Sequence, residues 1–270
     1  MRILIAGGSG YVGSRIIERL GGEHDFINLS LTRPAQGAIN NLLLDLTQPI
    51  DFLRLDQPVD MVINCIECYR AGSQEEGKRR YLAVVRNLLE FAKANRVPRF
   101  MHFSVNNIDT VENDYQQAKF VAEGLVEHAG LDHLIFKPSI IFGDKSPLQR
   151  LISVLTTRRV LPRFWGPQTV ISPIHIEDVL RNVAHALDHP ECWGATYPLC
   201  GPEYMGFEEL LSRHAPHRLR FVTTPALAAR LALFRMSRGE AERHLRPMLS
   251  WIATDNIAQG RPLLRSKNFF

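Results

Sequence analysis

Three glycines at every third position, Gly7, Gly10 and Gly13, directly follow a short apolar run near the start of the chain. Between a strand and a helix, such glycines permit a tight turn, close approach of a phosphate to the backbone, and close packing of helix on strand. The first helical turn, with Tyr11 and Val12, would then point its N–H groups at the anion. The segment therefore predicts a loop that binds the pyrophosphate of a dinucleotide. The alternative is a glycine turn that serves packing alone.

A tyrosine and a lysine four residues apart could move a proton to or from a substrate. Tyr115 and Lys119 would share one face of a helix predicted over Asp114–His128. A phenol has a pKa of about 10, so it serves as an acid or base near neutral pH only beside a cation. Lys119 could supply that charge. The alternative is an exposed pair on an ordinary helix.

The residues after the second predicted strand bear on which dinucleotide would bind. A site for NAD places an acid there to hold the ribose 2′-hydroxyl. This chain instead has Leu31, Thr32 and Arg33, without an acid. The planar fork of a guanidinium suits a 2′-phosphate, so Arg33 favours NADP over NAD. The alternative is a surface arginine in a turn before Pro34.

The elements that would position these residues alternate between apolar strands and amphipathic helices in the first half of the chain. Parallel strands need crossover helices, so this alternation predicts an α/β fold of the Rossmann type, with a doubly wound parallel sheet. The predicted strands are Arg2–Ala6, Asp25–Thr32, Asn41–Leu44, Met61–Asn64, Phe100–Ser104 and His133–Lys137, and the predicted helices are Tyr11–Leu20, Lys78–Asn95 and Asp114–His128.

The regular alternation of strands and helices ends after Phe142, where proline and glycine become frequent. Helices are predicted beyond it over Leu148–Thr157 and Ile176–Asp188. We expect a dinucleotide-binding lobe over residues 1–145, to which the segment 170–200 returns. Residues 146–270 would form a smaller C-terminal lobe that faces a substrate or a partner.

The composition is that of an ordinary globular protein, with 45% hydrophobic and 22% charged residues among 270. The net charge of +4 does not indicate nucleic acid. Arginines between Arg213 and Lys267 predict a solvated basic face or, alternatively, a site for an acidic protein or an anionic surface. There is no apolar run of about 18 residues that would cross a membrane. The chain enters a strand pattern at once, so we expect no signal peptide and a cytoplasmic location.

The remaining candidates are predicted to be structural. Cys65 and Cys68 form a lone CxxC at the end of a predicted strand, without the second pair that zinc needs. We expect them to be small buried residues and predict no metal site. His175 is expected to be structural, and Trp165 with Arg163 could line a substrate cleft or pack the smaller lobe.

Several segments, in order along the chain, resemble the extended and atypical short-chain dehydrogenase/reductase superfamily, which is NAD-dependent epimerase/dehydratase-like. They are the glycines of IAGGSGYVGSRI, read as GxxGxxG, the pair Asp45-Leu46, YQQAK from Tyr115 to Lys119, KPSIIFGD from Lys137 to Asp144, and PIHIEDV from Pro173 to Val179. HFSVNNI, KPSIIFG and the short C-terminal lobe look most like the atypical branch. That branch includes proteins similar to the nucleotide-binding accessory subunit of respiratory complex I.

The resemblance implies roles for individual residues. Asp45 and Leu46 would meet the adenine, and Lys119 would hydrogen-bond a ribose as well as assist Tyr115. Pro138 and Ile140 would lie in the loop beside the nicotinamide.

The catalytic set departs from the family pattern at two positions. Asn106 stands where the family has a serine or threonine, and Tyr81 stands where it has a supporting asparagine. Asn106 could still donate a hydrogen bond to a substrate oxygen, although not as a hydroxyl would.

These features together predict an NADP-preferring oxidoreductase that acts on a small carbonyl or hydroxyl substrate. A hydride would move between nicotinamide C4 and a substrate carbon, while Tyr115 supplies or removes the proton at oxygen. One alternative is a sugar-nucleotide epimerase or dehydratase, which keeps its cofactor bound. The other is a dinucleotide-binding assembly or sensor protein without catalysis, for which the altered catalytic set and the basic C-terminal half argue.

Overall fold

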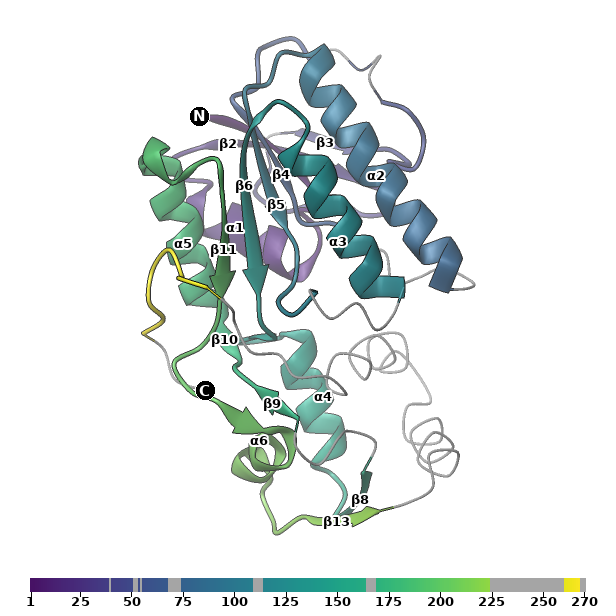
Figure 1. The fold of residues 1–270 in the computed structure, drawn as a ribbon, viewed down its shortest axis with the longest axis vertical. Helices are drawn as coiled ribbons and strands as arrows, with labels where there is room; N and C mark the ends of the chain where they lie inside the picture. Colours follow the sequence, from purple (N-terminus) through teal and green to yellow (C-terminus); the bar gives the residue numbers. More distant parts are fainter. Residues whose placement is uncertain are drawn as a thin grey trace. The chain divides into compact units, whose positions relative to one another are not determined.

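The computed structural model of the chain describes residues 1–38, 40–50, 53, 55–67, 74–108, 114–163, 169–223 and 260–267. The chain divides into two compact units (Figure 1). The first unit comprises Met1–Pro138, Val179–Leu199 and Gly260–Leu264, and the second comprises Ser139–Asp178, Cys200–Gln259 and Arg265–Phe270. The first segment of the first unit thus ends at Pro138, whereas the sequence analysis placed the lobe boundary at residue 145.

A seven-stranded parallel sheet forms the centre of the first unit, in the order β11-β6-β5-β4-β1-β2-β3. The predicted Rossmann-type fold is confirmed. Its strands are β1 (Arg2–Ala6), β2 (Asp25–Ser30), β3 (Asn40–Leu43), β4 (Met61–Asn64), β5 (Arg99–Phe103), β6 (Asp132–Pro138) and β11 (Ala195–Leu199). The strand order reverses at β1, which has β2 on one side and β4 on the other. Ligands of doubly wound sheets bind at the carboxyl ends of the strands at such a switch point.

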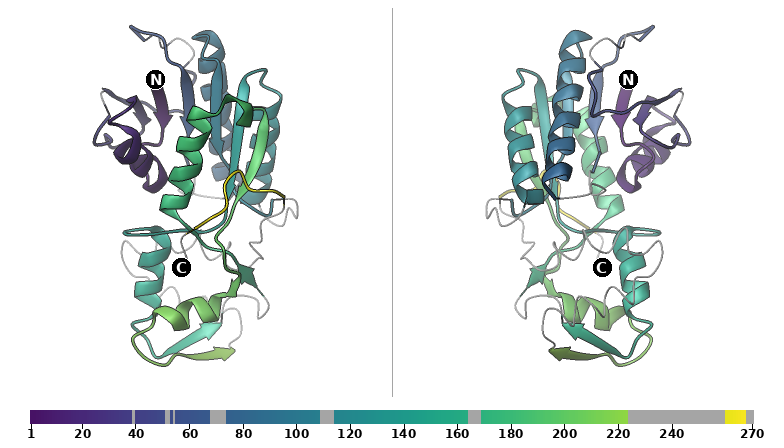
Figure 2. Two further views of the ribbon diagram at one scale, coloured as in Figure 1. Left: turned by 90° about the vertical axis from the view of Figure 1, so that its left-hand side faces the viewer. Right: turned by 90° about the vertical axis from the view of Figure 1, so that its right-hand side faces the viewer.

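Helices cover both faces of this sheet. Helices α2 (Gln74–Ala94) and α3 (Asp114–Glu127) lie side by side on one face, and α1 (Tyr11–Leu20) and α5 (Ile176–Asp188) lie on the other (Figures 1 and 2). Because both faces are covered, the strands read as continuous apolar runs, not as alternating ones. A short 3₁₀ turn, η1 (Pro190–Cys192), precedes β11.

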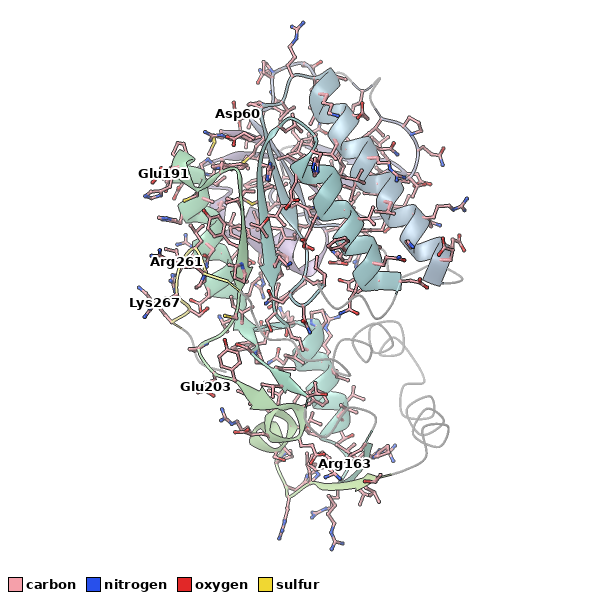
Figure 3. All side chains as sticks on the ribbon, viewed as in Figure 1. Asp60, Arg163, Glu191, Glu203, Arg261 and Lys267 are labelled. Carbon is pink, nitrogen blue, oxygen red and sulfur yellow. The ribbon has the colours of Figure 1, made fainter. Side chains whose placement is uncertain are left out.

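A hydrophobic core lies between the sheet and the pair α2 and α3. Strand residues such as Leu4, Val62 and Phe100 pack there with Leu88 of α2 and Ala122 of α3, and all five are fully buried. At the amino ends of the strands, Asp60 directly before β4 accepts a hydrogen bond from the backbone N–H of Arg2 at 2.7 Å; Figure 3 labels Asp60.

The second unit has its own small core, formed by α4 (Pro147–Leu155), α6 (Phe207–His214) and short strands that pair two by two. The strands are β7 (Ile141–Phe142), β8 (Val160–Arg163), β9 (Val170–Ile171), β10 (Ile174–His175), β12 (Met205–Gly206) and β13 (Arg220–Thr223). Ser146 caps α4 by accepting a hydrogen bond from the N–H of Gln149 at 3.0 Å. Arg163, labelled in Figure 3, pairs with Glu208 of α6.

Some predicted features lie outside the described residues: Cys68, Trp165 and most of the arginine-rich segment before Gly260. Within the part of the chain that the structure describes, no helix is long and apolar enough to cross a membrane. No group of three or more metal-ligating side chains gathers among those residues either.

A chain of buried polar side chains crosses the core of the first unit. Asn64 at the end of β4 lies with its Nδ2 3.1 Å from Nδ1 of His102, and His102 Nε2 lies 3.3 Å from the hydroxyl of Tyr81 on α2. An amide N–H can only donate, so Nδ1 of His102 accepts and Nε2 carries the proton. Burial, reinforced by the charge of Lys119, lowers the pKa of His102 from 6.5 to about 3. The imidazole is therefore neutral in the folded chain.

The buried imidazole predicts an acid-sensitive fold. His102 takes up a proton near pH 6.5 when unfolded but only near pH 3 when folded, so the unfolded chain binds more protons between these values. The free energy of unfolding then falls as the pH is lowered, by up to about 1.4 kcal/mol per pH unit. Replacing His102→Gln should remove this part of the slope. Urea unfolding from about pH 7 to about pH 5, above most carboxylate titrations, would measure it.

The exposed His128 provides a matched control, because His128→Gln should leave the slope unchanged. Equal slopes for the wild type and His102→Gln would contradict a neutral, buried imidazole.

Candidate functional site

The glycine loop lies at the carboxyl end of β1, at the switch point of the sheet. Gly7 has a φ of +88°, in the left-handed region that favours glycine, and its N–H donates to the carbonyl of Leu29 at 2.9 Å. Gly10 is the N-cap of α1, with no side-chain cap and no acid in the first turn. A helix N-terminus without a side-chain cap and without an acid in its first turn favours the binding of an external anion.

The glycines of the loop have different physical roles. A Cβ on Gly13 would lie 2.4 Å from the carbonyl oxygen of Gly7 and 2.8 Å from Cα of Gly8, so only glycine fits there. A Cβ on Gly10 would meet a single atom, the carbonyl oxygen of Gly7 at 3.1 Å. Gly13 thus serves the packing of α1 against the loop, whereas a side chain on Gly10 would require only a small shift of one backbone oxygen.

Gly8 is a part of the loop that the sequence analysis missed. A Cβ on Gly8 would lie 2.6 Å from Oδ1 of Asn28, and the N–H of Gly8 donates to that oxygen at 2.9 Å. Together with Gly10 and Gly13 it gives the spacing GxGxxG of the dinucleotide fingerprint, and that signal was present in the sequence.

The buried amide of Asn28 connects the glycine loop to the segment that carries Arg33. Its Nδ2 donates to Oδ1 of Asn41 at 2.9 Å, and the same oxygen of Asn41 accepts from the N–H of Ala35 at 2.7 Å. Ser30, the last residue of β2, donates through its hydroxyl to the carbonyl of Arg33. The backbone around Arg33 is thereby held, while its side chain is exposed.

Lys119 lies at the centre of the second part of the site, on α3, and is fully buried. Its Nζ donates to Oε1 of Glu67 at 2.6 Å and to the carbonyl of Phe103 at 3.2 Å. It also lies 4.6 Å from the centroid of the Tyr81 ring, a favourable cation–π distance. Burial by itself would lower the pKa of Lys119, but Glu67 with Tyr115 and Tyr81 outweighs it and raises the pKa well above its usual value.

Tyr115 and Lys119 are brought together by the structure, and Glu67 joins them. The hydroxyl of Tyr115 donates to Oε2 of Glu67 at 3.3 Å, so one carboxylate contacts both members of the pair. Glu67 follows β4 and its side chain is 30% exposed. The sequence analysis missed this residue; the available signal was an acid directly after a buried strand, at the edge where ligands bind.

The glycine loop and the segment of Glu67 are neighbours. A Cβ on Gly7 would lie 3.1 Å from the backbone of Cys65 and from Cγ1 of Ile66. Cys65 itself is partly buried, and burial raises the pKa of its thiol, with Glu67 adding to the effect. The two parts of the site thus meet where β1 and β4 end.

The two positions that depart from the family pattern are both built into the core. Asn106 is 4% exposed, and its Nδ2 donates to the carbonyl of Leu199 in β11 at 3.4 Å. Tyr81 is 3% exposed, and its hydroxyl contacts His102. The aromatic ring of Tyr81 therefore lies beside Lys119.

The residues that the resemblance placed near the adenine have different surroundings. Asp45 is exposed and accepts hydrogen bonds from the N–H and hydroxyl of Thr47 at 3.0 and 2.7 Å, which lower its pKa. Leu46 is 4% exposed, with its side chain in the core that α2 and α3 cover. Any contact of Leu46 with a ligand would therefore come from its backbone.

The remaining candidates divide between the units. Tyr11 and Val12 are half-buried at the start of α1, where the guanidinium of Arg15 lies 5.9 Å from the Tyr11 ring. Pro138 is buried at the end of β6 and accepts through its carbonyl from the N–H of Asn106 at 3.1 Å. Ile140 belongs to the second unit, and its side chain lies in that unit's core.

Solved structures share this fold across most of the chain. A nucleoside-diphosphate-sugar epimerase from Staphylococcus aureus gives a TM-score of 0.72 at 18% identity, covering 97% of this chain and 93% of that one. UDP-glucuronic acid 4-epimerase from Bacillus cereus, in complex with NAD, gives a TM-score of 0.69 at 16% identity, covering 83% and 88%. At these identities the likeness shows the fold.

Two curated relatives are each named NADH dehydrogenase (ubiquinone) 1 alpha subcomplex subunit 9, mitochondrial. The protein of Dictyostelium discoideum is 24% identical over 120 residues, or 44% of this chain. The protein of Rattus norvegicus is 26% identical over 124 residues, or 45% of this chain. The matched segment spans only 33% of the length of each relative.

Residues 3–197, which include the glycine loop, Glu67, Tyr115 and Lys119, match the NAD dependent epimerase/dehydratase family. This range is well over half of the chain and contains five of the seven strands of the sheet completely, together with most of β1 and β11. The predicted superfamily is confirmed, and the chain belongs to the NAD dependent epimerase/dehydratase family.

Proposed function

We propose that this chain binds an NADP-type dinucleotide at the glycine loop and uses Tyr115 and Lys119 in hydride-transfer chemistry on a small carbonyl or hydroxyl substrate. The observation that carries the proposal is the uncapped N-terminus of α1 beside Gly10, at the switch point of the sheet. The N-terminus of a helix attracts the negative charge of a pyrophosphate, and a glycine at the N-cap lets the phosphate approach the backbone closely.

The preference for NADP rests on Arg33. Its backbone is held by Ser30 and by the amides of Asn28 and Asn41, while its guanidinium is exposed. Among the described residues no acid lies within ion-pair distance of Arg33, so its charge is available to a 2′-phosphate. Ser30, not an acid, ends β2, where a site for NAD would hold the ribose 2′-hydroxyl.

The chemistry rests on the pair of Tyr115 and Lys119. A bound nicotinamide would supply or accept the hydride, and the protein would handle the proton. Tyr115 would exchange a proton with the substrate oxygen, because it is the half-exposed member of the pair. Lys119 would provide the positive charge that favours the phenolate, in the manner of other tuned acids and bases.

A second candidate function is dinucleotide binding without catalysis, in a protein that assembles with or senses a partner. The ion pair between Glu67 and Lys119 favours it, because the carboxylate offsets the positive charge that Tyr115 would need. The names of the two curated relatives, both subunits of NADH dehydrogenase, give it a precedent in similar proteins.

The proposed phosphate loop predicts that Gly10→Val abolishes binding of NADPH while the protein stays folded. The side chain would fill the space of the pyrophosphate, yet its Cβ would meet only one atom of the protein, at 3.1 Å. Calorimetry with NADPH and circular dichroism would measure the two effects. Gly22→Val is the matched control, since a Cβ there meets nothing within 4 Å. Unchanged affinity in folded Gly10→Val would mean that the loop is only a turn.

The proposed cofactor preference predicts that Arg33→Ala weakens the binding of NADPH by about 1.5–3 kcal/mol, the range for a hydrogen bond to a charged group. The affinity for NADH should be nearly unchanged, because NADH has no 2′-phosphate. Exposed Arg19, in the last turn of α1, gives the control variant Arg19→Ala. Equal losses for both dinucleotides, or none, would remove Arg33 from the site.

The proposed chemistry predicts that Tyr115→Phe lowers turnover by about 10²–10⁴, the usual contribution of general acid–base catalysis. The affinity for NADPH should barely change, because the phenolic proton matters mainly in the transition state. NADPH oxidation with a panel of small carbonyl compounds would measure turnover. If the wild type and Tyr115→Phe bind NADPH equally and neither turns over, the non-catalytic function is favoured instead.

A further inference from the structure

We propose that Glu67 is a positioning residue that sets the protonation state of Tyr115: its carboxylate balances the charge of Lys119 and holds Tyr115 as a neutral phenol. The inference deepens the proposed function and rests on it for its meaning in catalysis. The inference is based on the geometry of the Glu67 carboxylate, because one of its oxygens contacts Lys119 and the other contacts Tyr115. Oε1 lies 2.6 Å from Nζ of Lys119, and Oε2 accepts from the Tyr115 hydroxyl at 3.3 Å.

A fully buried ammonium needs an anion beside it. Isolated charges in a protein interior are strongly disfavoured, so buried lysines are paired or become neutral. The other contacts of Lys119, the carbonyl of Phe103 and the ring face of Tyr81, are attractive but uncharged. In the described part of the chain, Glu67 is the acid within ion-pair distance of Lys119.

The same carboxylate opposes ionisation of Tyr115. A phenolate would place a second negative charge against Oε2 of Glu67 and would lose the hydrogen bond that the neutral hydroxyl donates there. If the carboxylate is removed, the Tyr115 phenolate becomes the nearest anion able to balance Lys119, whose Nζ lies 5.8 Å from the Tyr115 ring centroid. The state of Glu67 therefore decides between a neutral phenol and an ammonium–phenolate pair.

The other polar groups around the pair do not provide this control. His102 on β5 is neutral, because burial lowers its pKa to about 3. Cys65 stays a thiol at neutral pH, because burial raises its pKa. Tyr81 on α2 is 3% exposed and contacts His102 through its hydroxyl. Glu123, one turn beyond Lys119 on α3, lies 3.5 Å from Lys137 and pairs with it.

Glu67 is placed where a bound molecule can reach it. Its side chain is 30% exposed, and the residues just before it contact the glycine loop through Gly7. A ligand whose hydroxyl groups donate to the carboxylate, such as a ribose, would compete with Lys119 and Tyr115 for its oxygens. Binding of such a ligand would thereby release the pair for acid–base chemistry.

Spectroscopic titration of tyrosine in the ligand-free protein tests this inference directly. The absorbance of tyrosinate is followed from neutral to alkaline pH, and the difference between each protein and its Tyr115→Phe partner isolates Tyr115. We expect Glu67→Gln to lower the pH at which Tyr115 ionises by about 1–3 pH units. This is the usual effect of a nearby opposite charge on a pKa, and the variant leaves the positive charge of Lys119 without its carboxylate. Glu67→Asp retains the charge and should titrate close to the wild type.

Exposed Glu127, on the same helix as Tyr115, gives the control Glu127→Gln, which should leave the titration unchanged. If Glu67→Gln does not fold, Glu67→Met removes the charge with a side chain of similar length and allows the same comparison. Ionisation of Tyr115 at the same pH with and without the carboxylate would overturn the proposal. Calorimetry with NADPH is a separate measurement, so a failure to bind dinucleotide would overturn the proposed function and leave the titration result standing.

Discussion

The ammonium of Lys119 lies fully inside the first unit, and a charge in that environment must be paired and hydrogen-bonded. Its partners come from four different elements. Glu67 follows β4, Phe103 ends β5, Tyr81 lies on α2, and Tyr115 is one turn earlier on α3. The pairing of β4 with β5 and the packing of α2 on α3 therefore have to place all of these groups around one nitrogen atom. The position of this charge constrains both the fold and the candidate chemistry.

The departures from the family pattern are connected through this charge. The ring face of Tyr81, the residue that the resemblance aligns with the family's asparagine, lies 4.6 Å from the ammonium of Lys119. Its hydroxyl is in turn satisfied by His102, and His102 by Asn64. Glu67 adds a carboxylate on the exposed side. Tyr115 and Lys119 therefore lie in electrostatic surroundings set by Glu67 and by the ring of Tyr81.

The glycine-loop part of the candidate site depends on a different interaction, the buried amide of Asn28. One side of this amide accepts from Gly8 in the glycine loop, and the other side donates toward Asn41 and so holds the segment after β2. A buried amide of this kind is stable only when its donors and acceptors are satisfied, which fixes the two loops relative to each other. The glycine loop and the segment with Arg33 are thus joined by one network of hydrogen bonds.

The sequence by itself determined the elements and much of the loop chemistry. The strands β1 and β4 and the helices α1 and α5 have the predicted bounds, because apolar periodicity and glycine turns are local properties of the chain. The shared helical face of Tyr115 and Lys119 follows from their spacing of four. Glu67 lies 52 residues from Lys119, and Asn28 lies 20 residues from Gly8. Their contacts exist only because β4 lies beside β5 and β2 beside β1, and β11 completes the sheet from a distant segment. Which charges and amides become neighbours is decided by strand order and burial, and these arise only when the chain is folded.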